Sequence, residues 1–376
     1  MLKMKKGSVD IYFMKIALRE AKKGLGRTSP NPAVGAVLVK EGKILSKGYH
    51  KAYGLPHAEV EALKKAGDRA SGATLYVTLE PCNHYGKTPP CTQAIIKSQI
   101  KRVVIGMRDP NPSVKGGGAD FLREHGIEVK EEVLEEECRE LNKHYIKFVT
   151  KGIPFVAIKV AMTLDGWIAT STGHSKWITN EASRRFVHRL RDIVDAVLVG
   201  IGTVLSDDPM LNTRLKKRRG KDPLKIIIDP YLRIPRDCNV LKNNPEKAII
   251  VVGKGAVSKE EIDSFKKETS ADVIECPFKK EKELDLNQML LSLAKRNVTY
   301  VMVEGGAKTI GSFLKQRCVD EFFIFKAPKL IGGSDGIPMA YGKGAESMDK
   351  AIEIKVLKIR RFQSDLLIHG YPVFNE

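Results

Sequence analysis

The sequence lacks a long hydrophobic run. No apolar stretch approaches the roughly 20 residues that a membrane-spanning helix needs, so we expect no transmembrane segment and no membrane partner. The N-terminus is basic and periodic, unlike the charged start and apolar block of a signal peptide. Cysteine is also scarce. The six cysteines are scattered, which excludes a dense disulfide framework and predicts a reducing, cytoplasmic location.

Aromatic residues are few as well, at 7% of the chain, although the formal net charge is +19. Grooves that bind single-stranded nucleic acid combine basic residues with stacking aromatics. The densest basic cluster, KKRRGK at residues 216–221, has no aromatic interleaved, and elsewhere lysine and arginine are mixed with glutamate. We therefore expect no nucleic-acid partner. The positive charge instead suits attraction of small anionic ligands.

The length of 376 residues exceeds that of one ordinary domain, and two are expected. A composition of 42% hydrophobic and 29% charged residues is typical of a globular protein. A short joint at Lys151-Gly152 follows a charged segment and precedes a strongly apolar one. We therefore predict one domain over residues 1–150 and a second over residues 151–376.

A cluster of metal-binding residue types lies in the first of these domains. His57 is followed two residues later by Glu59, and Cys82 follows Pro81, with Cys91 eight intervening residues further on. Three ligands leave one zinc coordination position open, which is typical of a catalytic site. The pattern is close to the His-x-Glu and Pro-Cys-x-x-Cys signature of zinc deaminases, apart from the longer spacing between the cysteines. Glu59 would then carry protons.

The flanking residues predict how these side chains meet. Residues two apart do not share a face in mid-helix, so His57 must lie at the entrance of the helix expected at 58–66, after Pro56. A strand at 73–79 would deliver Cys82, and Cys91 would open a helix at 92–98. His84 lies between the cysteines and is either a competing ligand or a substrate contact. Asn31 is either a turn former or a side chain that hydrogen-bonds a substrate ring.

Both domains show alternating helical and strand patterns. In the first we expect further helices at 10–23, 118–125 and 135–148, and strands at 33–39, 43–49, 101–107 and 127–133. In the second we expect strands at 154–162, 224–228, 248–252, 299–303, 351–358 and 363–368, and helices at 181–191 and 308–315. A buried strand from residue 196 should run into a glycine-rich turn at 200–203. This alternation indicates an α/β domain.

The strand at 299–303 leads through Glu304-Gly305-Gly306 into a helix. Exposed backbone N–H groups at a helix N-terminus suit a phosphate, although a glycine pair is also an ordinary tight turn. The dinucleotide-binding fingerprint G-x-G-x-x-G is absent. The planar guanidinium groups of Arg191 and Arg214 match the geometry of a phosphate. The alternative is that both are solvated surface residues.

The motifs together resemble a known family. SPNPAVGAV, HAE and TLEPCNHYGKTPPC resemble the deaminase half of the bifunctional deaminase/reductases of riboflavin biosynthesis. KVAMTLDG, SKWIT, VLVGIGTVLSDDPMLNTR and VEGGAKTIGSF, in that order, resemble the reductase half. The resemblance covers nearly the whole chain. It implies a zinc cytidine-deaminase-like three-layer α/β/α domain followed by an α/β domain similar to dihydrofolate reductase.

The resemblance also implies the chemistry. A zinc-dependent hydrolytic deamination of 2,5-diamino-6-(5-phosphoribosylamino)pyrimidin-4-one would precede an NADPH-dependent reduction of the ribosyl group to ribityl. The partners would be phosphorylated pyrimidines, and we expect a homo-oligomer. His174 stands where the family pattern suggests an acidic or small polar residue.

Residue roles follow from the matched motifs. In the deaminase half, Zn²⁺ would be held by His57, Cys82 and Cys91, with Glu59 as the proton shuttle and Asn31, His84 and Lys87 on the substrate. The NADPH contacts would be Ala161, Trp177, Thr203, Asp207, Gly306, Ala307, Lys308, Thr309, Ile310, Gly311 and Ser312. The contacts of the second substrate would be Lys159, Ser175, Arg191, Leu211, Arg214 and Glu304.

Two other functions are kept open. A deaminase acting on a base in RNA, with the second half as an RNA-binding module, would need stacking aromatics beside a basic groove. A zinc-dependent binding protein without turnover would not need a glutamate two residues after the histidine. Glu59→Gln should leave the function of a binding protein intact. NADPH oxidation that requires the sugar phosphate is expected only of the deaminase/reductase.

Overall fold

A computed structural model describes residues 6–86, 89–112, 117–215, 220–279 and 283–374 of the chain. The chain divides into two compact units, Met1–Gly152 and Ile153–Glu376. The boundary predicted after residue 150 falls inside the last turn of a helix, α6 (Lys143–Lys151). Gly152 ends this helix in the left-handed conformation, with φ of 70°, which glycine adopts without steric cost.

A five-stranded sheet in the order β2-β1-β3-β4-β5 forms the centre of the N-terminal unit. Its strands are β1 (Gly35–Lys40), β2 (Lys43–Tyr49), β3 (Thr74–Leu79), β4 (Arg102–Met107) and β5 (Glu128–Lys130). β3, β4 and β5 run parallel, whereas β1 pairs antiparallel with β2 and β3. β1 and β3 are buried almost throughout because both of their faces are covered, and their sequences are accordingly continuous apolar runs.

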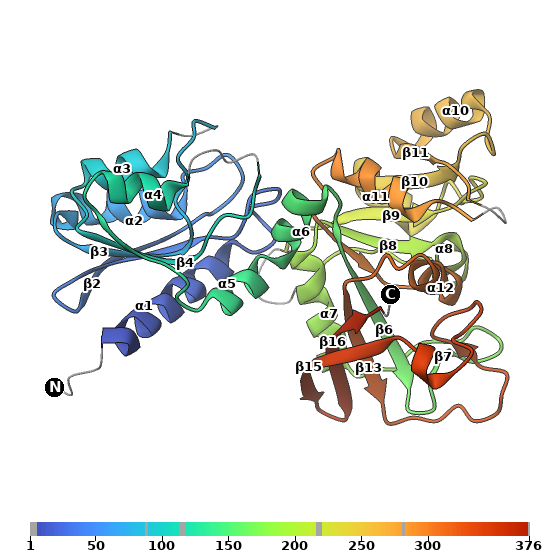
Figure 1. The fold of residues 1–376 in the computed structure, drawn as a ribbon. Coiled ribbons are helices and arrows are strands. Elements are labelled where there is room, and N and C mark those ends of the chain that lie inside the picture. Colours follow the sequence, from blue (N-terminus) through green and yellow to red (C-terminus); the bar gives the residue numbers. More distant parts are fainter. Residues whose placement is uncertain (1–5, 87–88, 113–116, 216–219, 280–282, 375–376) are drawn as a thin grey trace. The chain divides into compact units, whose positions relative to one another are not determined.

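Helices cover both faces of this sheet (Figure 1). One layer holds α2 (Ala58–Ala66), α3 (Cys91–Lys97) and α4 (Gly118–Glu124), and the other holds α1 (Lys6–Ala21) and α5 (Glu135–Leu141). α2 lies very close to the sheet, since a Cβ on Gly48 of β2 would come within 2.2 Å of the Ala58 carbonyl oxygen. The predicted three-layer α/β/α fold is confirmed, and α2 brings His57 to the end of the sheet.

The C-terminal unit is built on a nine-stranded sheet in the order β11-β10-β9-β8-β12-β6-β13-β16-β15. Its strands are β6 (Phe155–Thr163), β8 (Ala196–Gly200), β9 (Leu224–Ile228), β10 (Ala248–Gly253), β11 (Asp272–Cys276), β12 (Tyr300–Val303), β13 (Glu321–Ala327), β15 (Glu353–Phe362) and β16 (Asp365–Val373). The strands from β11 to β13 run parallel, and β16 is antiparallel to both of its neighbours. A small second sheet pairs β7 (Trp167–Ala169) with β14 (Ile337–Pro338).

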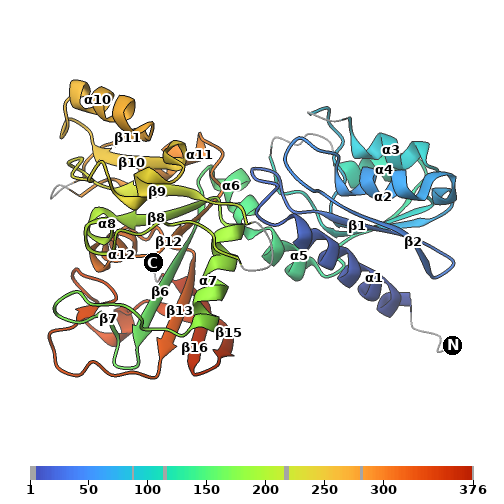
Figure 2. The same ribbon diagram turned by 180° about the vertical axis from the view of Figure 1, so that it is seen from behind.

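Alternate residues of the central strands point into two separate cores. Met302 of β12 joins the core beneath α7 (Glu181–Ile193), α9 (Asn239–Lys242) and α10 (Lys259–Thr269). Val301 and Val303 join the other core, beneath α11 (Leu286–Ala294) and α12 (Ala307–Lys315). Figure 2 shows α7 on the face opposite to the one seen in Figure 1. The predicted α/β architecture is confirmed in this unit too.

Two expected elements differ in the structure. The single helix predicted at 135–148 is two helices, α5 and α6, separated at Asn142. Asn142 is fully buried, and its side-chain amide exchanges two hydrogen bonds with the backbone of Ala33, at 2.8 and 3.0 Å. This tertiary contact fixes Asn142 outside helical geometry, with φ of −113°.

The glycine-rich turn expected after residue 200 is instead a helix, α8 (Ile201–Asp207). Ile201 and Val204, three residues apart, pack into the core and so favour the helix over a turn. The predicted strand at 127–133 shortens to β5. The sequence patterns did not reveal α10, β11, α11 or β13.

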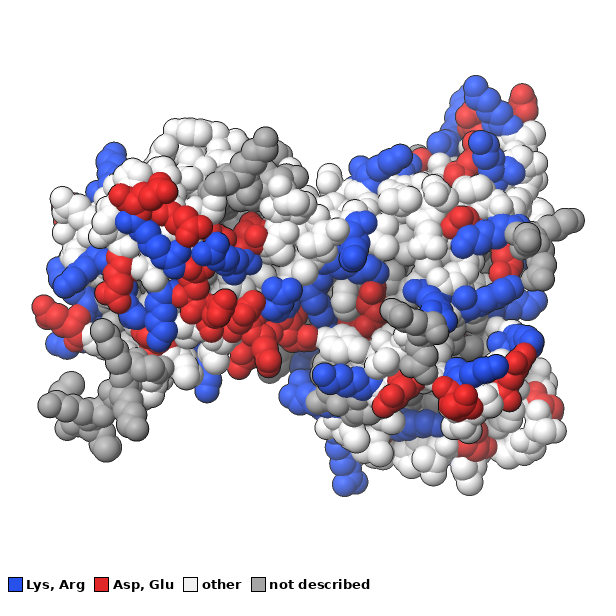
Figure 3. Space-filling model, in the orientation of Figure 1, with Lys and Arg blue, Asp and Glu red and all other residues white. Residues whose placement is uncertain are grey.

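Basic and acidic side chains are interspersed on the face shown in Figure 3, as the sequence suggested. Figure 3 also shows acidic residues gathered over part of the N-terminal unit. Within the described part of the chain, none of the helices combines the length and apolar character needed to cross a membrane.

Candidate active sites

Three candidate metal ligands from separate segments converge in the N-terminal unit. His57 is the N-cap residue of α2, Cys82 lies in the loop after β3, and Cys91 is the first residue of α3. His57 Nδ1 lies 3.5 Å from Cys82 Sγ and 3.3 Å from Cys91 Sγ. The three donor atoms all lie within 4.8 Å of one another. The arrangement is the one that the flanking prolines and strand ends predicted.

The donor atoms fit a tetrahedral zinc ion. Typical Zn–N and Zn–S bonds at tetrahedral angles place nitrogen and sulfur about 3.5 Å apart, close to the separations of 3.5 and 3.3 Å from His57 to the two cysteines. Hydrogen bonding from Cys91, together with His57, holds the pKa of the Cys82 thiol well below its usual range. Thiolate is the form that binds metal. His84 is exposed and outside this cluster, so its alternative role as a ligand is wrong.

Glu59 lies beside the cluster in the first turn of α2. Its side chain is almost fully buried, and Oε2 has no hydrogen-bond partner among the residues that the structure describes. Burial raises the pKa of Glu59 to about 7. A buried polar atom of this kind needs a partner, which a water or a substrate group at the open metal position would supply. A carboxyl group that titrates near neutral pH is suited to proton transfer.

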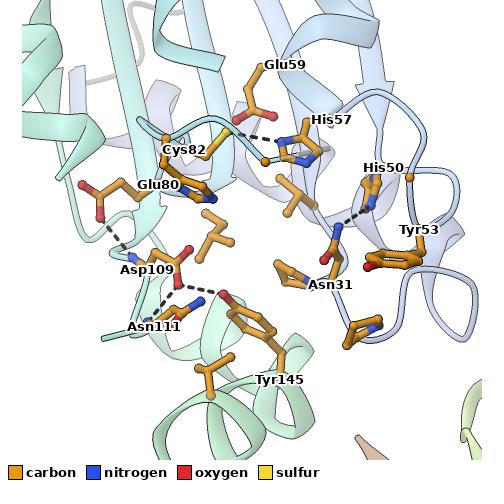
Figure 4. A pocket seen from close by; sticks show the side chains of 18 of the residues that line it. Asn31, His50, Tyr53, His57, Glu59, Glu80, Cys82, Asp109, Asn111 and Tyr145 are labelled. Carbon is orange, nitrogen blue, oxygen red and sulfur yellow. Dashed lines mark hydrogen bonds between the residues drawn. The ribbon is translucent and has the colours of Figure 1, made fainter. Parts of the chain in front are cut away.

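A cavity of about 340 Å³ extends from these residues, within the size range of small-molecule sites. Figure 4 shows Glu59, His57 and Cys82 at one end of it and Asp109, Asn111 and Tyr145 at the other. Asn31 and His84 line the cavity, as expected of substrate contacts. Lys87, the third expected contact, lies outside the described residues.

The sequence patterns did not single out several polar residues of this cavity: His50, Tyr53, Glu80, Asp109, Asn111 and Tyr145. His50 is buried and lies 3.3 Å from the Asn31 amide nitrogen through Nε2, and its Nδ1 donates to the Pro56 carbonyl oxygen. A signal was available for Asp109 and Asn111, because they follow the carboxyl end of a parallel strand, where binding residues gather. No comparable signal marked Tyr145, which α6 brings from 36 residues away in sequence.

In the C-terminal unit, Arg191 of α7 and Glu304, directly after β12, form a bidentate pair. Arg191 Nε and Nη2 donate to the two Glu304 oxygens at 2.6 and 2.9 Å. Arg191 Nη1 also donates to the Asn212 carbonyl oxygen, at 2.9 Å. Burial opposes ionisation of Glu304, but the charge of Arg191 outweighs it and lowers the pKa of Glu304 to about 2.

Other expected substrate residues surround this pair. Lys159 of β6 and Glu304 interact electrostatically, and burial lowers the pKa of Lys159. The backbone N–H of Arg214 donates to His188 Nδ1 at 3.3 Å. Burial, with the charges of Arg191 and Arg214, lowers the pKa of His188 to about 4, so His188 stays neutral. Leu211 is buried in the same loop with a positive φ of 49°.

The expected phosphate turn lies between two helix N-termini. Gly200 caps α8 and Gly306 caps α12, and the Gly200 N–H donates to the Gly305 carbonyl oxygen. A Cβ on Gly306 would lie 3.3 Å from Thr203 Oγ1, so glycine keeps this space open. The space and the N–H groups at these helix N-termini suit a phosphate of a dinucleotide.

The remaining expected cofactor residues are more dispersed. Ala161 lies on β6 and Asp207 is the last residue of α8. Trp177 is 62% exposed beneath the Arg184 guanidinium, and its carbonyl oxygen accepts a hydrogen bond from Lys329. Ser175 precedes it in the same segment. Ile310 is fully buried in the core, so it could contact a ligand only through its backbone.

Comparisons with known proteins agree with this division. Residues 8–107 match the model of the cytidine and deoxycytidylate deaminase zinc-binding region, and residues 154–368 match the RibD C-terminal domain. The riboflavin biosynthesis protein RibD of Aquifex aeolicus is 45% identical over 96% of this chain and 98% of its own length. RibD of Escherichia coli is 36% identical over 96% and 98% of the two chains.

Solved structures agree as well. The crystal structure of a diaminohydroxyphosphoribosylaminopyrimidine deaminase/5-amino-6-(5-phosphoribosylamino)uracil reductase from Thermotoga maritima has a TM-score of 0.85 and 41% identity, covering 98% of this chain and all of the other. Acinetobacter baumannii RibD has a TM-score of 0.88 and 36% identity, with the same coverage.

Proposed function

The chain belongs to the RibD family of riboflavin biosynthesis proteins, and from this premise we propose which of its residues serve the two reactions. It is a bifunctional enzyme, with a zinc-dependent deaminase in the N-terminal unit and an NADPH-dependent reductase in the C-terminal unit. Its substrates are small phosphorylated pyrimidines. The alternatives of an RNA deaminase and of a zinc protein without turnover are therefore wrong.

In the deaminase, we propose that His57, Cys82 and Cys91 hold the zinc ion. Zinc bound by three such ligands would supply a water that ionises near neutral pH and can attack the amino-bearing ring carbon. Glu59 accepts a proton from the attacking water at Oε2 and passes it to the ring nitrogen, and it then passes a second proton, from the hydroxyl added to the ring carbon, to the departing ammonia. Its burial and its pKa near 7 support this role.

The polar side chains across the cavity would hold the pyrimidine. Asn31, His84, Asp109 and Asn111 line it together with the metal ligands. Amide and carboxylate groups suit the amino and carbonyl substituents of an aminopyrimidinone. A contact between Lys87 and the substrate phosphate stays a prediction.

In the reductase, NADPH supplies a hydride when bound. The turn at Gly306 and the N-terminus of α12 would hold one of its phosphates, through residues 306–312 with Thr203 beside them. Ala161, Trp177 and Asp207 are proposed as further contacts from the matched motifs. The glycine-lined space and the paired helix N-termini support this placement.

The second substrate would lie against Glu304 and its basic neighbours. Lys159 and Arg191 interact with the Glu304 carboxylate, and Arg214 lies close enough to interact with Arg191, so the basic side chains outnumber the carboxylate and suit the substrate phosphate. Glu304 is ionised, so it accepts a hydrogen bond from a sugar hydroxyl. Ser175 and Leu211 complete the proposed set. Cytoplasmic location and homo-oligomeric state stay predictions.

The observation that carries the deaminase assignment is the convergence of three metal ligands with a buried glutamate. We test it by supplying NADPH with either the diaminopyrimidine phosphate or its deaminated product. Glu59→Gln should stop NADPH oxidation with the first substrate and leave it intact with the second. Glu61→Gln, on the same helix and paired with Lys51, is the matched control. Wild-type oxidation rates in Glu59→Gln with the diaminopyrimidine would overturn the assignment.

A further inference from the structure

Glu80 links three segments of the deaminase cavity wall. It follows β3, and its backbone N–H donates to the Met107 carbonyl oxygen at the end of β4, at 2.9 Å. Its carboxylate Oε2 accepts the Asp109 N–H at 3.0 Å, and Oε1 accepts the Ala119 N–H in the first turn of α4 at 2.9 Å. Each oxygen therefore serves a different segment. A side-chain amide, which has a single acceptor oxygen, would satisfy only one of them.

The same turn carries a metal ligand. Glu80 stands two residues before Cys82, and α4 packs directly on the intervening residue, since a Cβ on Gly118 would come within 1.8 Å of the Pro81 carbonyl oxygen. The Glu80 carboxylate thus joins the backbone that holds Cys82 to the backbone that holds Asp109. Short contacts therefore fix the separation of these two segments.

Asp109 is held from its side chain as well. Oδ1 accepts hydrogen bonds from the Tyr145 hydroxyl at 2.9 Å and from the Asn111 N–H at 3.0 Å. Figure 4 shows the other Asp109 oxygen on the side toward the cavity, across from His57 and Cys82. An oxygen so placed can accept an N–H of the pyrimidine, and its usefulness depends on its distance from the metal ligands.

We propose that Glu80 is a positioning residue of the deaminase, which sets the distance between the Asp109 carboxylate and the metal ligands by holding the Asp109 backbone. Glu80 acts on the substrate only through Asp109. The inference rests on the proposed function of this cavity as the site of the aminopyrimidine. It adds a reason why the glutamate in the Thr78-Leu79-Glu80-Pro81-Cys82 run is needed although it is not a metal ligand.

The test is the variant Glu80→Gln, measured in the full-length zinc-loaded enzyme. We expect a rise of about tenfold in the deaminase KM, the size of effect that loss of a hydrogen bond to a charged group gives. The deaminase kcat, the zinc content and the reductase activity should stay near those of the wild type. Glu124→Gln, exposed on α4, is the matched control and should change nothing. A wild-type KM in Glu80→Gln would overturn the inference.

A double-mutant cycle separates positioning of Asp109 by Glu80 from a general loss of order in the cavity wall. If Glu80 acts through Asp109, Glu80→Gln should raise KM in the wild type but add nothing in an Asp109→Asn background. If the KM of the double variant instead rises by the product of the two single effects, the inference is overturned. An unchanged KM in Asp109→Asn alone would instead overturn the assignment of this wall to the substrate. Should Glu80→Gln fail to fold, Glu80→Asp keeps the charge and shortens the reach by one methylene. The same rise in KM is then expected, and its absence counts against Glu80.

Discussion

At the scale of single residues, the two sites use buried carboxylates in opposite ways. Glu59 lies where burial dominates, so its pKa rises to about 7 and the group can exchange protons. Glu304 is also buried, but the Arg191 guanidinium lowers its pKa to about 2 and keeps it ionised. The same residue type therefore serves proton transfer in one site and charge recognition in the other, because Glu304 is paired with an arginine side chain, whereas Glu59 Oε2 has no hydrogen-bond partner among the described residues.

This contrast predicts the cost of removing Arg191. Arg191→Ala should leave Glu304 buried without its bidentate partner and destabilise the C-terminal unit by about 3–5 kcal/mol. Urea unfolding followed by tryptophan fluorescence measures the loss, because Trp167 and Trp177 both belong to the C-terminal unit. Arg189→Ala, exposed on the same helix, is the control. A stability equal to that of the control would show that Glu304 finds another partner.

At the scale of elements, α12 depends on a glycine for its position. Gly311 lies within the helix, where alanine is normally favoured by up to about 1 kcal/mol. Here a Cβ would come within 1.8 Å of the Tyr341 carbonyl oxygen, so the backbone would have to move. We expect Gly311→Ala to destabilise the C-terminal unit and to weaken NADPH binding by displacing the N-terminus of α12.

The matched control for this variant is Gly202→Ala in α8. Nothing lies within 4 Å of a Cβ at Gly202, so the ordinary helix preference should apply and the variant should be slightly more stable than the wild type. Thermal unfolding measures both variants. Equal shifts in the same direction would contradict the role of the Tyr341 contact.

α1 is tied to the sheet of the N-terminal unit by a buried carboxylate. Asp10 accepts hydrogen bonds from Tyr76 of β3, Arg102 of β4 and Lys130 of β5. Burial opposes the ionisation of Asp10. The hydrogen bonds from Arg102 and Lys130 outweigh burial and lower the pKa of Asp10 from 3.8 to about 2. Because the folded pKa is depressed, Asp10 stabilises the fold above about pH 4, and this stability is lost as the pH falls toward 2.

We therefore predict that the wild type loses about 2 kcal/mol of stability through Asp10 between pH 5 and pH 2. Urea unfolding at several pH values, followed by a probe in the N-terminal unit, measures this loss. Asp10→Asn lacks the titrating group, so the difference in stability between the two proteins should shrink as the pH falls. A difference that stays constant over this range would count against the argument.

At the scale of the whole molecule, two compact units with separate cores carry two activities. The metal ligands belong entirely to the first unit, and the glycine turn and the Arg191–Glu304 pair belong to the second. A ligand that binds one folded unit stabilises that unit by mass action.

We therefore expect each ligand to act on its own unit. Removal of zinc by a chelator should lower the unfolding temperature of the N-terminal unit and abolish deamination, with reduction of the deaminated substrate unchanged. NADPH at about 100 times its Kd should stabilise the C-terminal unit by about 2.7 kcal/mol. Scanning calorimetry with and without each ligand measures both effects. A single transition shifted equally by zinc and by NADPH would contradict independent units.

The sequence by itself determined the fold class, the metal ligands and Glu59. Those residues stand at fixed short spacings beside strand ends and helix starts, so local geometry is enough to predict that they meet. Apolar runs such as those of β1 and β8 likewise predicted buried strands. The sequence patterns failed where local signals were weak or were overridden, as at Asn142 and in α8.

Only the tertiary structure decided the remaining parts of the two sites. Glu80, Asp109 and Tyr145 come from three segments, and their roles depend on hydrogen bonds between residues 29 and 36 positions apart. The pairing of Arg191 with Glu304 spans 113 positions. The physical reason is that a buried charge takes its pKa and its function from the partners that folding brings to it, and spacing along the chain does not specify those partners.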